Sequence, residues 1–200
     1  MNAKRLALSA CAALFLAACA VGKPIPQPRT YVVDPTPVAP AASAARRAET
    51  LRMGNVRVAA AYAGNALVYR MDDVAYTSDP YHAFIAAPGA MLGNRMAEWL
   101  DRSGPFDAVA QPGSTQPAAY VLDATVTELY GDFRAGQPPA AVIAVQFALI
   151  DQAGVRPRVV RESTIAQRVD LPRASPDALV RGYGEALGQI LSQLVSDFGA

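Results

Sequence analysis

The segment from residue 140 to residue 150 reads AAVIAVQFALI and carries apolar side chains on both faces of an extended chain. It is too short to cross a bilayer as a helix, which needs about 20 residues. A short strand that is apolar on both faces is typical of the interior of a sheet. We therefore expect a central strand at 140–150, and the rest of the chain has to supply its neighbours.

The segments around this run supply strands and two helices. Residues 119–129 alternate between apolar and polar and predict a half-buried strand, whereas the more polar residues 158–169 predict a strand near a sheet edge. A helix begins at Pro88 and ends before Gly104, and a second begins at Pro176 behind a serine N-cap. Two amphipathic helices against a mostly antiparallel sheet predict a single α+β domain.

The first half of the chain gives weaker signals. Residues 55–61 and 66–70 are β-like and flank Gly64-Asn65, so they predict a hairpin that residues 74–76 extend. Ser78-Asp79-Pro80 predicts a break. A short strand is expected at 30–34 and another at 106–110, with a loop at 111–117. The Ala/Pro/Ser-rich residues 35–50 predict a loop or a weak helix.

The N-terminus has the order of a secretory signal: Lys4 and Arg5, then an apolar stretch over residues 6–15. Leu16-Ala17-Ala18-Cys19 is similar to the bacterial lipobox, in which the cysteine thiol is acylated and becomes the first residue of the mature chain. We expect lipidation at Cys19. The alternatives are a secreted protein with an unmodified cysteine and an uncleaved anchor.

These signals divide the chain into a signal peptide (1–18), a tether with the Pro/Ala-rich segment (19–53) and a folded domain (54–200). The Pro-rich tether reaches roughly 30 Å at ~3.1 Å per residue, so the domain stays near its membrane. Residue 20 is Ala rather than Asp, and by resemblance to Gram-negative lipoproteins this favours the outer membrane, facing the periplasm, over the inner membrane.

Cysteine occurs only at positions 11 and 19, one in the signal and one at the lipidation site, so we expect a domain without disulfides. Removing Lys4 and Arg5 leaves 16 basic against 17 acidic side chains. A surface so close to neutral argues against nucleic-acid binding, and against anionic-membrane binding as the main activity.

Catalytic equipment is sparse. The only histidine is His82, and a periplasmic hydrolase would have to use it, with Ser78 and Asp79 as its nearest partners in sequence. The sequence shows no zinc ligand set, no calcium loop and neither glycine-rich nucleotide motif. We expect no enzyme activity, no metal and no cofactor.

Aromatic side chains gather at predicted strand ends and loops. Such residues cap a core or provide anchors for a partner protein or an acyl chain. The candidate contact residues are Tyr69, Tyr76, Phe84, Tyr130 and Phe133.

An ordered series of short motifs runs from about residue 56 to residue 198. It contains, in order, LVYR at 67–70 followed by Tyr76, Phe84, Pro88 with Met91-Leu92, Trp99-Leu100 with Ser103-Gly104, Phe106 with Val109, YVL at 120–122, LYGDF at 129–133, PAAV at 139–142 and Ala186-Leu187. The succession resembles the auxiliary lipoprotein component of ABC-type transport systems, a family that includes the paraquat-inducible intermembrane transport lipoprotein. The insert at 35–50 matches none of the motifs.

The resemblance implies a lipoprotein that works beside an ABC permease, its ATPase and a mammalian-cell-entry (MCE) domain protein. Such systems move phospholipid or other hydrophobic substrates between the inner and outer membranes. The implied role is a docking or receiving subunit, and only Cys19 carries over as a defined site. Contact with phospholipid and assembly with further copies of the chain stay open. The alternative is a structural or assembly lipoprotein of an outer-membrane complex.

Overall fold

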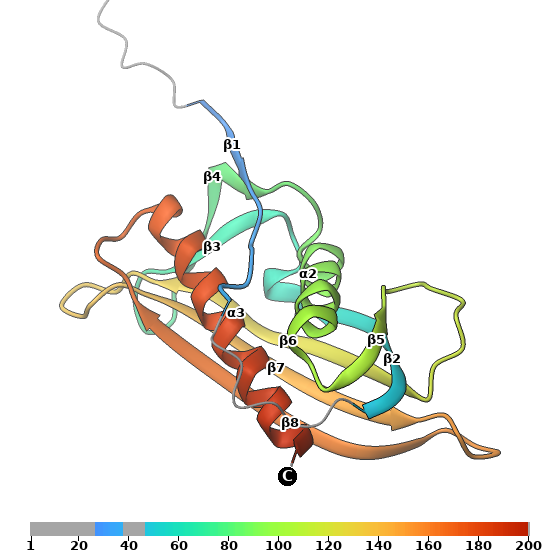
Figure 1. Cartoon of the computed structure of the whole chain (residues 1–200). Coiled ribbons are helices and arrows are strands. Elements are labelled where there is room, and N and C mark those ends of the chain that lie inside the picture. The colour runs from blue at the N-terminus through green and yellow to red at the C-terminus, as the bar shows by residue number, and fades with distance from the viewer. Residues whose placement is uncertain (1–26, 38–46, 200) are drawn as a thin grey trace, which may run out of the picture.

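The structure, a computed structural model, describes residues 27–37 and 47–199, so the predicted signal peptide and the predicted lipidation site at Cys19 lie outside the described residues. The strands are β1 (Arg29–Tyr31), β2 (Arg47–Val58), β3 (Ala66–Arg70), β4 (Tyr76–Phe84), β5 (Phe106–Ala110), β6 (Tyr120–Asp132), β7 (Ala140–Asp151) and β8 (Arg158–Asp170). The helices are α2 (Pro88–Ser103) and α3 (Pro176–Gly199), with one turn of 3-10 helix, η2 (Ala60–Tyr62). One sheet and two α-helices in this part of the chain confirm the predicted α+β class (Figure 1).

The sheet is mixed, with the order β1-β4-β3-β6-β2-β5, and β7 and β8 follow on the other edge of β6. Its longest pairings, β6–β7 and β7–β8, are antiparallel. Both β2 and β3 run parallel to β6. Strand β7 lies between β6 and β8, as its apolar sequence predicts, and the more polar β8 lies at an edge.

The predicted hairpin between residues 55–61 and 66–70 is wrong. Strands β2 and β3 lie along the same edge of β6, where Val58 pairs with Val126 and Tyr69 pairs with Gly131. Because both strands run in the direction of β6, they cannot pair antiparallel with each other. The chain leaves this edge through η2 and the Gly64-Asn65 turn and returns to it as β3. The hairpin that forms is β3–β4.

Two other local predictions also need correction. The predicted loop or weak helix at 35–50 contains the start of β2, because residues 47–50 pair with β5 and extend the sheet. Ser78-Asp79-Pro80 does not end a strand, since β4 continues through it. A register shift absorbs the irregularity, because Val68 pairs with Ser78 whereas Ala66 pairs with Ala83. The strand predicted at 30–34 forms as β1, at residues 29–31.

Both helices cover the same face of the sheet (Figure 1). Helix α2 packs on β2 and β5, and α3 packs on β7 and β8. Pro88 occupies the start of α2, and the Ser175 hydroxyl oxygen accepts the N–H of Ala178 (3.4 Å) at the start of α3. The apolar stripe of α3, from Leu179 to Phe198, is buried against the sheet. Among the described residues, neither helix combines the length and the hydropathy needed to span a membrane.

Helix α3 also receives the chain segment that follows β1. The N–H of Thr36 donates to the carbonyl oxygen of Gly184 (2.9 Å). A Cβ at Gly184 would lie 2.4 Å from the carbonyl oxygen of Asp34, and a Cβ at Gly188 would lie 2.4 Å from that of Thr36. Glycine at both positions therefore lets the segment lie directly on the helix backbone.

We expect Gly188→Ala to destabilise the protein by about 1–3 kcal/mol, because the new methyl group overlaps the Thr36 carbonyl. The same change in a helix without such a neighbour stabilises by about 1 kcal/mol. The sign of the change in the free energy of unfolding, measured with urea, therefore reports whether residue 188 contacts the Thr36 carbonyl. Glu185→Ala, on the exposed side of α3, is the control and should change stability by less than about 0.5 kcal/mol.

Candidate functional site: the open face of the sheet

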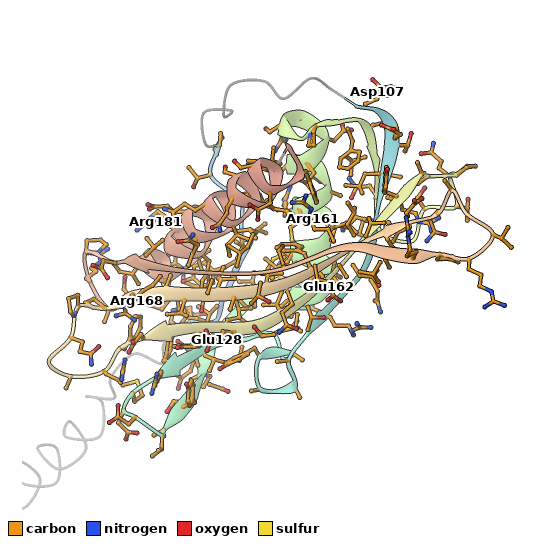
Figure 2. All side chains as sticks on the ribbon, turned by 90° about the horizontal axis from the view of Figure 1, so that it is seen from below. Asp107, Glu128, Arg161, Glu162, Arg168 and Arg181 are labelled. Carbon is orange, nitrogen blue, oxygen red and sulfur yellow. The ribbon has the colours of Figure 1, made fainter. Side chains whose placement is uncertain are left out.

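The two faces of the sheet differ. Odd-numbered side chains of β7, such as Val145 and Phe147, point toward the helices and are buried, whereas Gln146 between them is exposed on the other face. We call this second surface, formed mainly by β2, β6, β7 and β8, the open face, because the described chain places no α-helix over it. Figure 2 shows Glu128 and Glu162 on the open face and Arg181 on the helix side.

Three tyrosines form a cluster at one end of the open face. The Tyr62 ring from η2 stacks on Tyr130 from β6 (centroids 6.0 Å apart, 25° between planes). Tyr76 from β4 meets Tyr130 edge-on at 5.5 Å. The cluster packs over Val68 and Val142. Burial, then the neighbouring tyrosine rings, raises the pKa of Tyr62 to about 12, so its hydroxyl stays protonated in any physiological environment.

Charged groups border the tyrosine cluster. The Arg70 guanidinium lies over the Tyr76 ring (5.9 Å to the centroid) and donates to the carbonyl oxygen of Asp73. Asp132, at the end of β6, has a side chain only 2% exposed and accepts hydrogen bonds from Arg134 (2.9 Å) and Arg168 (2.6 Å). The Arg134 hydrogen bonds hold the pKa of Asp132 well below its usual range, against the effect of burial and with further help from Arg168.

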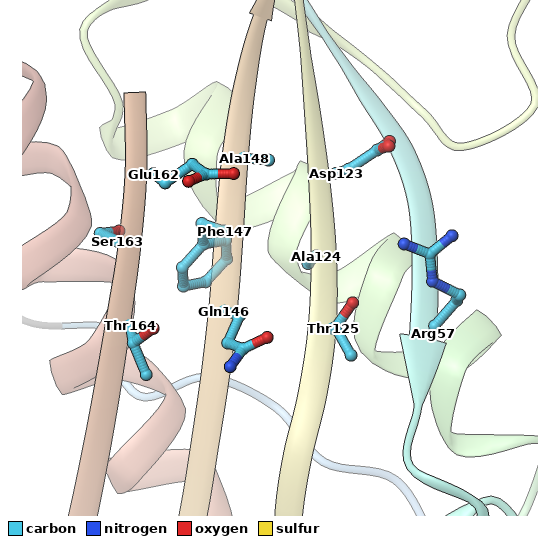
Figure 3. Close-up of a pocket in the computed structure, with 10 residues that line it drawn as sticks. All are labelled: Arg57, Asp123, Ala124, Thr125, Gln146, Phe147, Ala148, Glu162, Ser163 and Thr164. Atoms are coloured by element: carbon cyan, nitrogen blue, oxygen red, sulfur yellow. The ribbon is translucent and has the colours of Figure 1, made fainter. Parts of the chain in front are cut away.

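A polar hollow of about 370 Å³ lies further along the open face (Figure 3). Polar side chains from four strands line it: Arg57, Asp123, Thr125, Gln146, Glu162 and Thr164. The Asp123 carboxylate accepts the N–H of Asn55 (2.8 Å), which fixes its orientation. One guanidinium, two carboxylates and neutral donors can bind a polar group through hydrogen bonds. Among the described residues, no three His, Cys, Asp or Glu side chains are grouped as metal ligands.

The five aromatic residues singled out by sequence do not share one surface. Tyr76 and Tyr130 belong to the open-face cluster, and Tyr76 is 44% exposed. Tyr69 stacks on Phe133 on the helix side (4.9 Å between centroids). Phe84 is 3% exposed and packs near the Tyr183 ring, so it belongs to the core. Of the five, Tyr76 and Tyr130 therefore share the open face.

His82 lies in a hydrogen-bonded cluster near β1. Its Nδ1 is 2.9 Å from Asp79 Oδ2, and the Tyr69 hydroxyl donates to the same oxygen (2.5 Å). Asp79 Oδ1 accepts the backbone N–H groups of Tyr81 and His82. Burial raises the pKa of Asp79, but these hydrogen bonds outweigh it and leave the pKa lowered. Among the described residues, the side-chain hydrogen bond of His82 is to Asp79, and none joins His82 to Ser78.

Sequence reasoning missed Tyr62 and the polar hollow. The alternation of Asp123 and Thr125 with apolar residues predicts a polar face on β6, and that face is the one that lines the hollow. The alternation along β6 does not reveal that both helices pack on the opposite face of the sheet. Tyr62 follows a β-like run, and its place on the open face depends on η2.

Comparison with known proteins adds the family. Residues 31–195 match the model of the ABC-type transport auxiliary lipoprotein component family. The chain belongs to this family. The resemblance seen in the motifs is thereby confirmed. The family is described as an auxiliary component of ABC-type transport, and a lipoprotein component of an ABC transport system works in the cell envelope.

Solved structures share the fold of this auxiliary lipoprotein. A crystal structure of a Xanthomonas campestris protein from family DUF330 has a TM-score of 0.73 at 19% identity, covering 84% of this chain and 94% of that one. An uncharacterised protein has a TM-score of 0.61 at 18% identity, covering 75% and 92%. At these identities the likeness concerns the fold alone. A search of functionally curated proteins found no significant match.

We expect Asp132→Asn to destabilise this auxiliary lipoprotein by about 2 kcal/mol at neutral pH, because two arginines lose a charged acceptor. The pKa of Asp132 is lowered on folding, so its contribution is complete above the unfolded pKa of about 4 and is lost as pH falls through the folded value. The measurement is the free energy of unfolding in urea of the wild type and of Asp132→Asn, each at neutral and at acid pH. Asp170→Asn, at an exposed carboxylate, is the control, and an equal loss there would contradict the assignment.

Proposed function

We propose that this protein is anchored through acyl chains on Cys19, faces the periplasm from the outer membrane, and serves an MCE-type ABC system that moves phospholipid or another hydrophobic substrate between the two membranes. Residues 1–18 would be its signal peptide and residues 20–26 part of its tether. Its role would be that of a docking or receiving subunit. The match to the auxiliary lipoprotein family over residues 31–195 carries the proposal.

The open face is the proposed docking surface. Apolar area that a sheet does not cover with its own helices is available to a second protein. Here the tyrosine cluster offers rigid aromatic area with polar hydroxyls, which is typical of residues that dominate binding energy at interfaces. The polar hollow lies on the same face, where it can bind the polar rim of a partner or a lipid head group.

The proposed mechanism is positioning. The acyl anchor restricts the domain to one leaflet, and the short tether keeps it within roughly 30 Å of that leaflet. Restricting two partners to a small volume raises their effective concentration, so even a weak contact at the open face is occupied. The tyrosine cluster is the place where substrate contact would occur if the domain also receives lipid.

Crosslinking in cells tests the partner. A photoreactive residue at position 146 on the open face should capture an MCE-domain protein, whereas one at position 181, on the exposed side of α3, should not. Recovery of phospholipid with the complex would make the domain a receiver as well as a dock. Capture of only an outer-membrane barrel or cell-wall proteins would overturn the transport role in favour of the assembly alternative.

We expect Tyr76→Ala to weaken this capture about tenfold, the effect of losing a central aromatic contact. Tyr81→Ala is the matched control, because Tyr81 is an exposed tyrosine of the same strand that lies outside the cluster. Quantified crosslinking yield at equal protein level gives the measurement. Equal losses in the two variants would show that the cluster is not the contact.

We expect Cys19→Ala to release the protein from the membrane fraction. A thioether cannot form without the thiol, and multiple acyl chains are what gives stable anchoring. Fractionation and mass spectrometry of the N-terminal peptide measure the result. A variant that stays in the membrane fraction, together with an unmodified wild-type cysteine, would favour the uncleaved anchor.

A further inference from the structure

The turn between β7 and β8 carries exposed apolar and cationic side chains together. Val155 is fully exposed, and Val159 and Val160 are 49% and 42% exposed. Arg156 and Arg158 are exposed beside them, and within the described residues neither forms an ion pair or a side-chain hydrogen bond. The described chain therefore neither buries these three valines nor pairs these two arginines, so both are available to a surface outside it.

The segment of this turn contains no acidic residue of its own. Residues 153–161 read AGVRPRVVR, with three arginines and no carboxylate. The nearest acid in the ladder, Asp151, stands opposite Arg158, but within the described residues the two side chains form no ion pair, and Asp151 Oδ1 accepts the N–H of Ala153. Arg161 points to the helix side and donates to the Asp197 carbonyl of α3. The net charge of the whole chain is close to zero because acidic residues elsewhere balance these arginines. A count of charges over the chain therefore does not reveal the local cluster.

The β7–β8 turn projects from the end of the sheet, so a flat surface such as a membrane can contact it. The ladder of β6 with β7 starts at the pair Tyr120–Asp151, so residues 152–157 extend beyond the end of β6. In Figure 1 the β7–β8 hairpin reaches the right-hand end of the molecule, whereas β1 lies beside β4, away from that end. Nothing in the described chain covers the tip, which we define as residues 153–160.

We propose that the tip docks on an anionic phospholipid bilayer. Val155 would enter the head-group region while Arg156 and Arg158 bind lipid phosphates, the combination of apolar insertion and cationic attraction typical of interfacial membrane contacts. A stable protein interface needs about 20–30 residues on each side, far more than the tip offers. A small apolar apex with arginines around it fits a lipid surface better.

This contact is compatible with the proposed anchor. At about 3.3 Å per residue, β7 is about 40 Å long, comparable with the roughly 30 Å reach of the tether. A domain lying along the membrane can therefore satisfy the acyl anchor near β1 and the tip at the far end. Two attachments fix the tilt of the domain, which one flexible tether cannot do.

The test uses the full acylated chain reconstituted into vesicles of phosphatidylcholine, with or without phosphatidylglycerol. An environment-sensitive dye on Val155→Cys reports insertion through a blue shift and through quenching by brominated lipid tails. The control is Ala135→Cys in the exposed β6–β7 turn at the other end of the hairpin. Dye uptake by a chain with no added cysteine reports an unacylated Cys19, so failure of the anchor is detected separately.

We expect quenching at position 155, not at 135, and only with phosphatidylglycerol present. Each arginine near an anionic surface contributes about a fivefold gain, so Arg156→Gln with Arg158→Gln should lower the equilibrium constant for insertion about 30-fold. Both side chains are exposed, so the fold should survive, as equal thermal unfolding would verify. The proposal would be overturned if the dye at position 155 stayed in water, or if its quenching did not depend on phosphatidylglycerol. It would also be overturned if insertion required an acidic protein partner.

Discussion

Strand β6 is the element on which the rest of the structure depends. One of its edges pairs with β7 along nearly its whole length, and the other pairs first with β2 and then with β3. A bulge at Thr127 interrupts it, because Val126 pairs with Val145 and Glu128 already pairs with Ala144. One extra residue reverses the alternation of faces. Leu129 therefore turns to the helices, while Tyr130 and Asp132 turn to the open face.

The bulge thus creates the candidate site. Without it, Tyr130 would face α3, and the tyrosine cluster could not form with Tyr62 and Tyr76. With it, the open face has an aromatic end, Asp132 with its two arginines at the end of the same strand, and a polar hollow further along. A sheet with helices on one face only has to leave the other to solvent or to a partner.

The sequence predicted the helices and strands with clear periodicity, but it did not predict which strands pair in the sheet. The segments that became α2, α3, β5, β6, β7 and β8 have strong local signals, because each buries one face or both against the same core. The hairpin prediction for residues 55–70 failed because a turn signal at Gly64-Asn65 does not say which strand the next one joins. Tertiary pairing with β6 outweighed it. The sequence also did not show that Tyr69, Phe84 and Phe133 lie on the helix side of the sheet, away from Tyr76 and Tyr130.

The sequence by itself determined the fold class, the helix boundaries, the edge position of β8 and the family, because these depend on local periodicity and on the order of motifs along the chain. Tertiary structure decided which aromatic side chains share a surface and which strands are neighbours. It also decided that Val155 and Arg156 extend beyond the end of β6, next to Arg158 at the start of β8. Those outcomes depend on strand register and on a single bulge. A shift of one residue exchanges the two faces of a strand, so no local pattern can specify them.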